Sequence, residues 1–277
     1  MVKKFITVDS RFYILLALII TAGAFLRLWN LAADSLRLDE AQSIWQAAHS
    51  LEFIRTYMLK NVHLPLHNSL LHLWMSVFGS TPASVRLLAA IPGILALPAL
   101  YALARQFIER QWALLATTIA AFSPFLIWYS REIRMYSLLS LVTICSYLLY
   151  LKILRDGRLA WYILYALVNL IGIYTHYFFL LALLVQAIYF FLVWPCRLRP
   201  AGVNESKPQI LAGLTAVATF LLLSFLPWLY GLYSTYGSGS LAPVFGQPTS
   251  FNMVLSLFEF LFGAQSDALA GATIALW

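Results

Sequence analysis

Long, almost uncharged apolar runs alternate with short polar segments along the 277-residue chain. Most runs approach the ~20 residues that a helix needs to cross a bilayer. They are continuous, whereas strands of a membrane barrel would alternate with a period of two. The pattern therefore predicts an all-α fold, a polytopic transmembrane helical bundle. The runs cover residues 12–29, 66–79, 85–104, 112–129, 135–151, 160–175, 177–194, 209–233 and 251–263, with a fragment at 268–277.

Composition agrees with a lipid environment, because 62% of the residues are hydrophobic and only 10% are charged. A soluble domain is ~45–50% apolar and ~25% charged. The net charge of +7 could suggest a nucleic-acid partner. However, the basic residues lie in short clusters between apolar runs, which is the pattern that orients membrane proteins. We therefore expect no nucleic-acid partner.

The short run 66–79 decides the orientation of everything that follows it. If it lies flat on the outer surface and the N-terminus is cytoplasmic, most lysines and arginines fall in cytoplasmic loops, as the positive-inside rule requires. If it spans the membrane, that bias reverses. We therefore expect an interfacial helix over 66–79 and seven spans up to residue 233. The cytoplasmic basic residues are then Lys3, Lys4, Arg11, Arg105, Arg110, Lys152, Arg155, Arg158, Arg197, Arg199 and Lys207.

This topology divides the chain into two parts. Residues 1–233 form a transmembrane module, in which the outer loop 30–84 carries two interfacial helices, over 38–59 and 66–79. Residues 234–277 form a mobile outer loop rich in Gly, Ser and Pro, a short interfacial helix and the start of a further span. Because Trp277 falls within an apolar stretch, the chain is either short for its class or a fragment.

Two adjacent carboxylates, Asp39 and Glu40, open the first outer helix. Acidic residues at this place are also explained by the helix dipole alone. Successive helical residues point ~100° apart, so the two side chains cannot do the same job. One would face a cavity and the other would support it or bind an ion. On the functional interpretation, a carboxylate held at the membrane surface acts as a general base.

A second charged cluster lies in the short outer turn between two spans, at Arg131, Glu132 and Arg134. Arginine and aromatic residues are common at membrane interfaces, so an ordinary interfacial turn is one interpretation. Charges at membrane depth are costly, however, and tend to mark function. The forked donors of arginine suit phosphate, so a phosphate-binding turn is the other interpretation.

Three histidines, His63, His67 and His176, fall on the outer side of the same topology. Each could be an ordinary interfacial histidine. Together with the acidic residues they could also hold a divalent metal ion, for which Glu40, His63 and Glu132 are the candidates. The chain has no metal-ligand spacing such as HExxH, and metal use stays open. It also has no Gly-rich phosphate loop and no GxSxG motif, so we expect a lipid-borne substrate.

The segment FLRLWNLAADSLRLDEAQS (25–43) resembles the first span and loop of GT-C glycosyltransferases. The resemblance is closest to the group of protein O-mannosyltransferases, the aminoarabinose transferase of lipid A and the RgtA/B/C/D-like transferases. HLPLHNSLLHLWMSVFG (63–79) is similar to their next segment, and the spans at 84–107 and 113–141 and YTHYFFLL (174–181) continue the match. The chain departs from the family pattern at Leu64, where the first proline of a pair is usual.

The resemblance implies a GT-C-like fold and the transfer of a sugar from a polyprenyl-phosphate donor, with inversion, at the non-cytoplasmic face. The acceptor would be a lipid, a glycan or a protein, and the membrane a bacterial inner or plasma membrane. Asp39 falls on the expected general base. The substrate- and phosphate-binding candidates are Glu40, His63, Arg131, Glu132, Arg134 and His176. The alternatives are a lipid or solute transporter or flippase, a noncatalytic membrane scaffold, or another lipid-modifying enzyme such as an acyltransferase.

Overall fold

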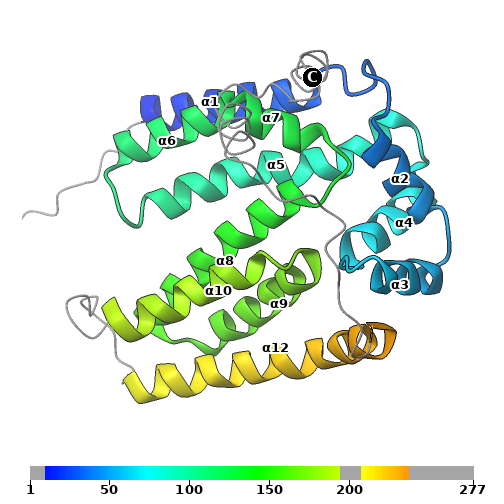
Figure 1. Ribbon diagram of the computed structural model, residues 1–277. Helices are drawn as coiled ribbons and strands as arrows, with labels where there is room; N and C mark the ends of the chain where they lie inside the picture. The colour runs from blue at the N-terminus through cyan, green and yellow to red at the C-terminus, as the bar shows by residue number, and fades with distance from the viewer. Residues whose placement is uncertain (1–9, 194–206, 237–277) are drawn as a thin grey trace, which may run out of the picture.

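The computed structural model describes residues 10–193 and 207–236, which form a bundle of helices without a strand in these ranges (Figure 1). The predicted all-α helical fold is confirmed. The predicted outer loop and short helix beyond Tyr236 lie outside the described residues. The elements are α1 (Ser10–Leu28), α2 (Leu38–Ala47), α3 (Leu51–Lys60), α4 (Leu66–Phe78), α5 (Pro82–Ala104), α6 (Arg110–Phe122), α7 (Pro124–Arg131), α8 (Tyr136–Asp156), α9 (Leu159–Thr175), α10 (Phe179–Ile188) with a π-helical turn (Tyr189–Val193), and α12 (Lys207–Tyr236).

Four of these helices, α1, α5, α8 and α12, are long and apolar enough to cross a membrane. The bent pair α6 and α7 makes a fifth candidate, and α9 and the segment Phe179–Leu192 are apolar but shorter. These segments coincide with the seven runs predicted as spans, and the seven-span count itself stays a prediction. In Figure 1, α2, α3 and α4 gather at one end of the long helices.

The predicted helix 38–59 is wrong in one respect, because the chain breaks it into α2 and α3. The segment 30–84, predicted as an outer loop with two helices, therefore carries three complete helices, α2, α3 and α4. The reason is local: the Ser50 hydroxyl accepts a hydrogen bond from the Phe53 N–H at 3.3 Å, which caps the start of α3. Aromatic side chains bridge the break, with the His49 and Phe53 rings stacked 4.2 Å apart.

The predicted span 112–129 is also interrupted, by a 55° bend between α6 and α7. Pro124 has no N–H and cannot continue the hydrogen bonding of α6. Instead it starts α7, a position that suits proline. The Ser123 hydroxyl caps the new helix by accepting from the Leu126 N–H at 3.3 Å. The run is one apolar stretch in sequence but two helices in structure.

Arg27 of α1 holds this bend from within the bundle. It is only 1% exposed, and its guanidinium donates to the Ala120 and Ala121 carbonyls at 3.1 and 3.0 Å. These carbonyls belong to the last turn of α6. Because the helix breaks there, they have no N–H partner within α6. A third bond, from Nε to the Ser130 hydroxyl at 3.2 Å, reaches α7. Arg27 thus fixes α7, and with it the turn that follows Arg131.

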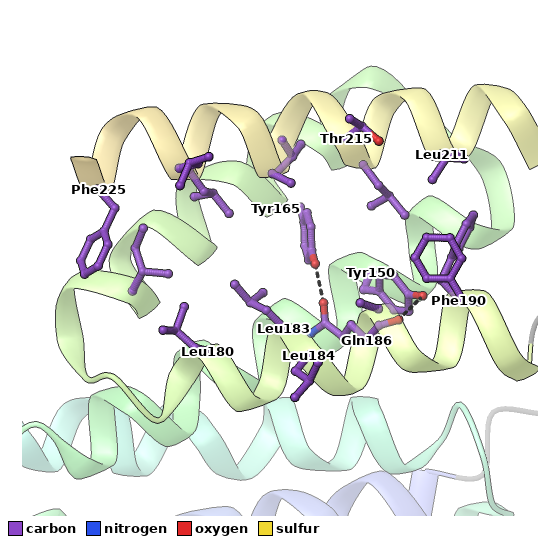
Figure 2. A pocket seen from close by; sticks show the side chains of 18 residues that line it. Tyr150, Tyr165, Leu180, Leu183, Leu184, Gln186, Phe190, Leu211, Thr215 and Phe225 are labelled. Atoms are coloured by element: carbon purple, nitrogen blue, oxygen red, sulfur yellow. Dashed lines mark hydrogen bonds between the residues drawn. The ribbon is translucent and has the colours of Figure 1, made fainter. Parts of the chain in front are cut away.

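Helices α8, α9, α10 and α12 enclose a cavity of about 530 Å³ (Figure 2). Most of its lining is apolar, and the Tyr165 hydroxyl donates to the Gln186 side chain. Gln186 in turn donates to the Ser146 hydroxyl at 3.0 Å. No charged side chain and none of the predicted site residues lines this cavity among the described residues.

Candidate functional site

The two charged segments that the sequence analysis singled out meet at one end of the bundle, where α2 begins. The Ile133 N–H donates to Glu40 Oε1 at 3.4 Å. One residue earlier in the same turn, Glu132 Oε1 lies 3.4 Å from Arg37 Nη1, just ahead of α2. The charges of Asp39 and Arg134 both act on the Glu132 carboxyl as well. The turn 132–135 and the start of α2 therefore form one site.

Glu40 is the buried member of the carboxylate pair, at 1% exposure. Its two oxygens accept from Arg86 Nε at 3.0 Å and Nη2 at 2.7 Å. They also accept from the backbone N–H groups of Arg37 and Ile133. Burial raises the pKa of Glu40, but the hydrogen bonds from Arg86 and the backbone outweigh this effect and hold the pKa below its usual value. This geometry favours a supporting role for Glu40 over contact with a substrate or metal ion.

Arg86 of α5 extends this support to the first outer loop. Its guanidinium also donates to the Leu31, Asp34 and Ser35 carbonyls, at 2.7, 3.0 and 3.1 Å. The loop before α2 is therefore wrapped around one arginine that also binds Glu40. Such bidentate arginine pairs fix geometry as well as charge.

Asp39, one residue before Glu40, is exposed. Its side chain makes no hydrogen bond or ion pair with any other residue that the structure describes, although its backbone carbonyl accepts from the Ser43 hydroxyl at 2.8 Å. The helix thus turns Glu40 into the protein and leaves Asp39, the residue before it, at the surface. Asp39 is therefore available to an incoming substrate, and Glu40 is not.

The Glu132 carboxyl lies near enough to both Asp39 and Arg134 to be affected by their charges. It is 8% exposed, and its Oε2 has no hydrogen-bond partner among the described residues. Burial raises the pKa of Glu132 above its usual value, against the opposing charges of Arg37 and Arg134. Arg37 itself stacks over the Trp128 ring at 5.2 Å.

The two arginines of the turn have different surroundings. Arg131 Nη2 donates to the Asn30 carbonyl at 3.1 Å and lies 3.9 Å from Asp34 Oδ2. Arg134 follows a tight turn in which its N–H donates to the Glu132 carbonyl at 2.7 Å, as in a γ-turn. The buried Arg134 Nε has no partner in the described part of the chain. Arg134 therefore keeps donors free for an anion, while Arg131 ties the turn to the first loop.

Three histidines lie close enough to Arg134 for its charge to affect their pKa values. Burial lowers the pKa of His67 to about 4, and the charge of Arg134 adds to the effect. Burial and the same arginine lower the pKa values of His63 and His176. The lowered pKa of each imidazole favours its neutral form. The sequence placed His67 on the outer side, but only the structure puts it beside Arg134.

The metal candidates Glu40, His63 and Glu132 are not gathered into one cluster of ligands in the structure. Within residues 10–193 and 207–236, no group of three or more His, Cys, Asp or Glu side chains is placed to hold a metal ion. Glu40 also has its oxygens engaged by Arg86. Arg134 Nε, without a partner among the described residues, lies in the same site as the exposed carboxylate of Asp39.

Comparison with known proteins identifies the family. The model of the dolichyl-phosphate-mannose-protein mannosyltransferase family matches residues 62–230. No curated protein sequence matches significantly. The solved structure of the Saccharomyces cerevisiae protein O-mannosyltransferase Pmt1–Pmt2 complex bound to the sugar donor is similar, with a TM-score of 0.56 and 17% identity. It matches over 84% of this chain and 35% of that chain.

The apo oligosaccharyltransferase of Archaeoglobus fulgidus is similar as well, with a TM-score of 0.58 and 14% identity over 81% of this chain and 30% of that chain. The present chain therefore spans about a third of the length of each solved chain. At these identities the structures show a shared fold. The family model itself matches more than half of the chain, residues 62–230. The chain belongs to the dolichyl-phosphate-mannose-protein mannosyltransferase family and has the fold of a GT-C-class membrane glycosyltransferase.

Proposed function

We propose that this chain is the membrane module of a glycosyltransferase that moves a sugar from a polyprenyl-phosphate donor to an acceptor lipid, glycan or protein. One observation carries the proposal: a free carboxylate, Asp39, and an arginine with unpaired donors, Arg134, lie near the same buried acid, Glu132. Family membership supports it, as does the similarity to a mannosyltransferase whose structure is bound to its sugar donor.

The proposed reaction is a single displacement. Asp39 takes the proton of the acceptor hydroxyl or amine as that group attacks the anomeric carbon of the donor sugar. The bond between this carbon and the phosphate oxygen breaks, and its electron pair leaves with the lipid phosphate. Arg134 stabilises the charge that develops on this phosphate. Attack from the face opposite the phosphate inverts the anomeric configuration.

The neutral histidines suit this reaction. An uncharged imidazole can donate one hydrogen bond to a phosphate oxygen without adding a second positive charge beside Arg134. Burial lowers the pKa values of His63, His67 and His176, and the charge of Arg134 lowers them further. The proposed phosphate would thus meet one positive charge, that of Arg134, and neutral hydrogen-bond donors from the histidines.

Replacing Arg134 by Met tests the proposal directly. We expect the rate of sugar transfer from a synthetic polyprenyl-phosphate sugar to fall about 10²-fold, as for the loss of one donor that stabilises a developing anion. Arg131→Met is the matched comparison in the same turn, and it should keep most activity because that side chain already pairs with Asn30 and Asp34. Labelled sugar that crosses the membrane without covalent transfer would instead identify a transporter.

The proposal also places α2, α4 and the turn 132–135 on the non-cytoplasmic side, with a cytoplasmic N-terminus. Cysteine labelling in intact cells tests this orientation, after Cys145 and Cys196 are replaced by Ser. An Asp34→Cys variant should react with an impermeant maleimide, because the Asp34 side chain is 76% exposed. An Arg158→Cys variant, at a side chain 73% exposed beyond α8, should react only after permeabilisation. The reverse pattern would overturn the orientation.

A further inference from the structure

The end of the bundle opposite the candidate site is strongly basic. Helices α5 and α8 both start at the site, where Arg86 and the turn 132–135 lie, and run away from it side by side (Figure 1). The 21 residues of α8 span about 30 Å. Basic side chains outnumber acidic ones at the far end, among those that the structure describes. The basic residues are Arg11, Arg105, Arg110, Lys152, Arg155 and Arg158, and the acidic residues are Glu109 and Asp156.

Two arginines after the last turns of α8 keep most of their donors available. Arg155 Nη2 donates to Gln106 Oε1 at 2.9 Å, and Arg158 Nε lies 3.5 Å from Asp156 Oδ2. Their other guanidinium N–H groups make no hydrogen bond or ion pair with any residue that the structure describes. Asp156 Oδ2 also accepts from the Trp161 indole at 3.2 Å, and Oδ1 is buried, out of reach of an anion at the surface. The two guanidinium groups can therefore receive an anion.

A groove of about 510 Å³ begins beside Arg158 and runs between α9 and α12. The two residues that flank Arg158 in sequence, Gly157 and Leu159, both line it. Most of the lining further along the groove is apolar. The apolar residues there are Ile163, Ala166, Ala216, Val217 and Phe220.

The groove is open along its length toward the outside of the bundle. Leu159, Ile163 and Phe220 on its rims are 73%, 52% and 43% exposed, which places hydrocarbon rather than protein against them. From Leu159 to Ala166 the groove follows seven residues of helix, about 10 Å. Its volume is well above the ~150 Å³ of an apolar cavity that binds benzene, so it has room for part of an acyl chain.

We propose that this end of the bundle binds an anionic phospholipid of the surrounding bilayer. Its phosphate lies on Arg155 and Arg158, and one of its acyl chains lies in the groove between α9 and α12. The lipid is a partner and not a reactant, because the length of α8, about 30 Å, separates it from the turn 132–135. The assignment therefore does not depend on the proposed sugar transfer. On the orientation proposed above, the lipid belongs to the cytoplasmic leaflet, where anionic lipids make the surface potential negative.

The pairing of two available arginines with an apolar groove distinguishes this partner from others. A soluble anion such as inorganic phosphate would leave the groove unfilled. A zwitterionic phospholipid would fill the groove, but its own ammonium group would lie close to Arg155 and Arg158. An anionic phospholipid accepts forked hydrogen bonds from the arginines and buries its chain in the groove.

Native mass spectrometry of the detergent-solubilised chain tests the charged part of the assignment. The first phosphatidylglycerol to bind should have a lower Kd than phosphatidylcholine with the same acyl chains. Replacing Arg155 and Arg158 together by Gln should raise the Kd for phosphatidylglycerol about 30-fold, the effect of about 2 kcal/mol for two basic residues. Arg11→Gln is the matched control, because it removes an exposed charge at the same end, on α1, and should leave this Kd unchanged.

Three results would overturn the charged part. They are an equal Kd for the two lipids, an unchanged Kd in the folded double variant, and displacement of phosphatidylglycerol by an equal concentration of inorganic phosphate. The last result would identify a site for a soluble anion instead.

Filling the groove is an independent test of where the acyl chain lies. Ile163→Trp on α9 and Ala216→Trp on α12 each place a large ring in it, and both residues are exposed, so the fold should tolerate the change. The Kd for phosphatidylglycerol should rise about tenfold, the effect of about 1.4 kcal/mol. Ala212→Trp is the matched control, because Ala212 is exposed on α12 and does not line the groove.

A phosphatidylglycerol with a diazirine on one acyl chain locates the lipid directly. We expect cross-links to residues 159–166 and 213–220, and fewer of them in the double arginine variant. Cross-links confined to α1 or α10, or an unchanged Kd in both folded groove variants, would show that the lipid lies elsewhere and overturn the assignment.

Discussion

Replacing Asp39 by Asn is expected to lower the rate of sugar transfer by about 10²–10⁴-fold, the usual contribution of a general base. The amide has nearly the shape of the carboxylate but cannot take a proton from the acceptor. Because the Asp39 side chain is exposed and has no partner among the described residues, its replacement should leave the fold intact. The KM for the donor should also stay close to that of the wild type, because Arg134 holds the phosphate.

The measurement is single-turnover transfer from a radiolabelled polyprenyl-phosphate sugar, together with a thermal melt in detergent. Asp34→Asn is the matched control. It changes another exposed carboxylate close to the start of α2, and the one ion pair that this side chain makes among the described residues, to Arg131 at 3.9 Å, is long. It should transfer sugar at close to the wild-type rate. An Asp39→Asn protein that retains normal transfer would remove Asp39 as the base.

Replacing the neighbouring Glu40 by Gln should act on stability rather than on chemistry. Arg86, whose side chain is 5% exposed, would lose its carboxylate partner and remain a buried charge. Breaking a buried ion pair in this way typically costs about 3–5 kcal/mol. We therefore expect a large fall in the unfolding temperature for Glu40→Gln, and loss of activity as a consequence of unfolding.

A double variant separates this effect from a direct role in the reaction. Glu40→Gln combined with Arg86→Met removes both charges and should recover part of the lost stability, because no uncompensated charge stays buried. The thermal midpoints of the two single variants and the double variant form the required cycle. A Glu40→Gln protein as stable as the wild type but inactive would assign Glu40 to catalysis instead of support.

The apolar runs were sufficient to predict where the long helices lie, because lipid leaves the backbone few other conformations. They did not reveal the two breaks. Ser50 and Pro124 are visible local signals, but hydrophobic residues continue on both sides of each, so the runs appeared unbroken. Only the cap at Ser50 and the 55° bend at Pro124 distinguish two helices from one.

The site was predicted in part for a related reason. Helical geometry required that Asp39 and Glu40 face different ways, but it did not say which of the two is buried. Glu40 is the buried one because it pairs with Arg86, 46 residues further along the chain. Likewise, His67 and Arg134 belong to separate segments that spacing alone does not bring together. Contacts of this kind depend on how helices are packed, which a hydrophobic pattern does not specify.

The guanidinium of Arg27 has a consequence for how the protein tolerates different membranes. Its acceptors belong to the ends of both α6 and α7, while a fourth bond returns to the Gly23 carbonyl of α1 itself at 2.9 Å. Pulling these helices apart would strand carbonyl groups in hydrocarbon, at a cost of several kcal/mol each. We therefore expect α1, α6 and α7 to tilt together as one unit when the bilayer thickness changes, so that the turn after Arg131 keeps its place relative to α1.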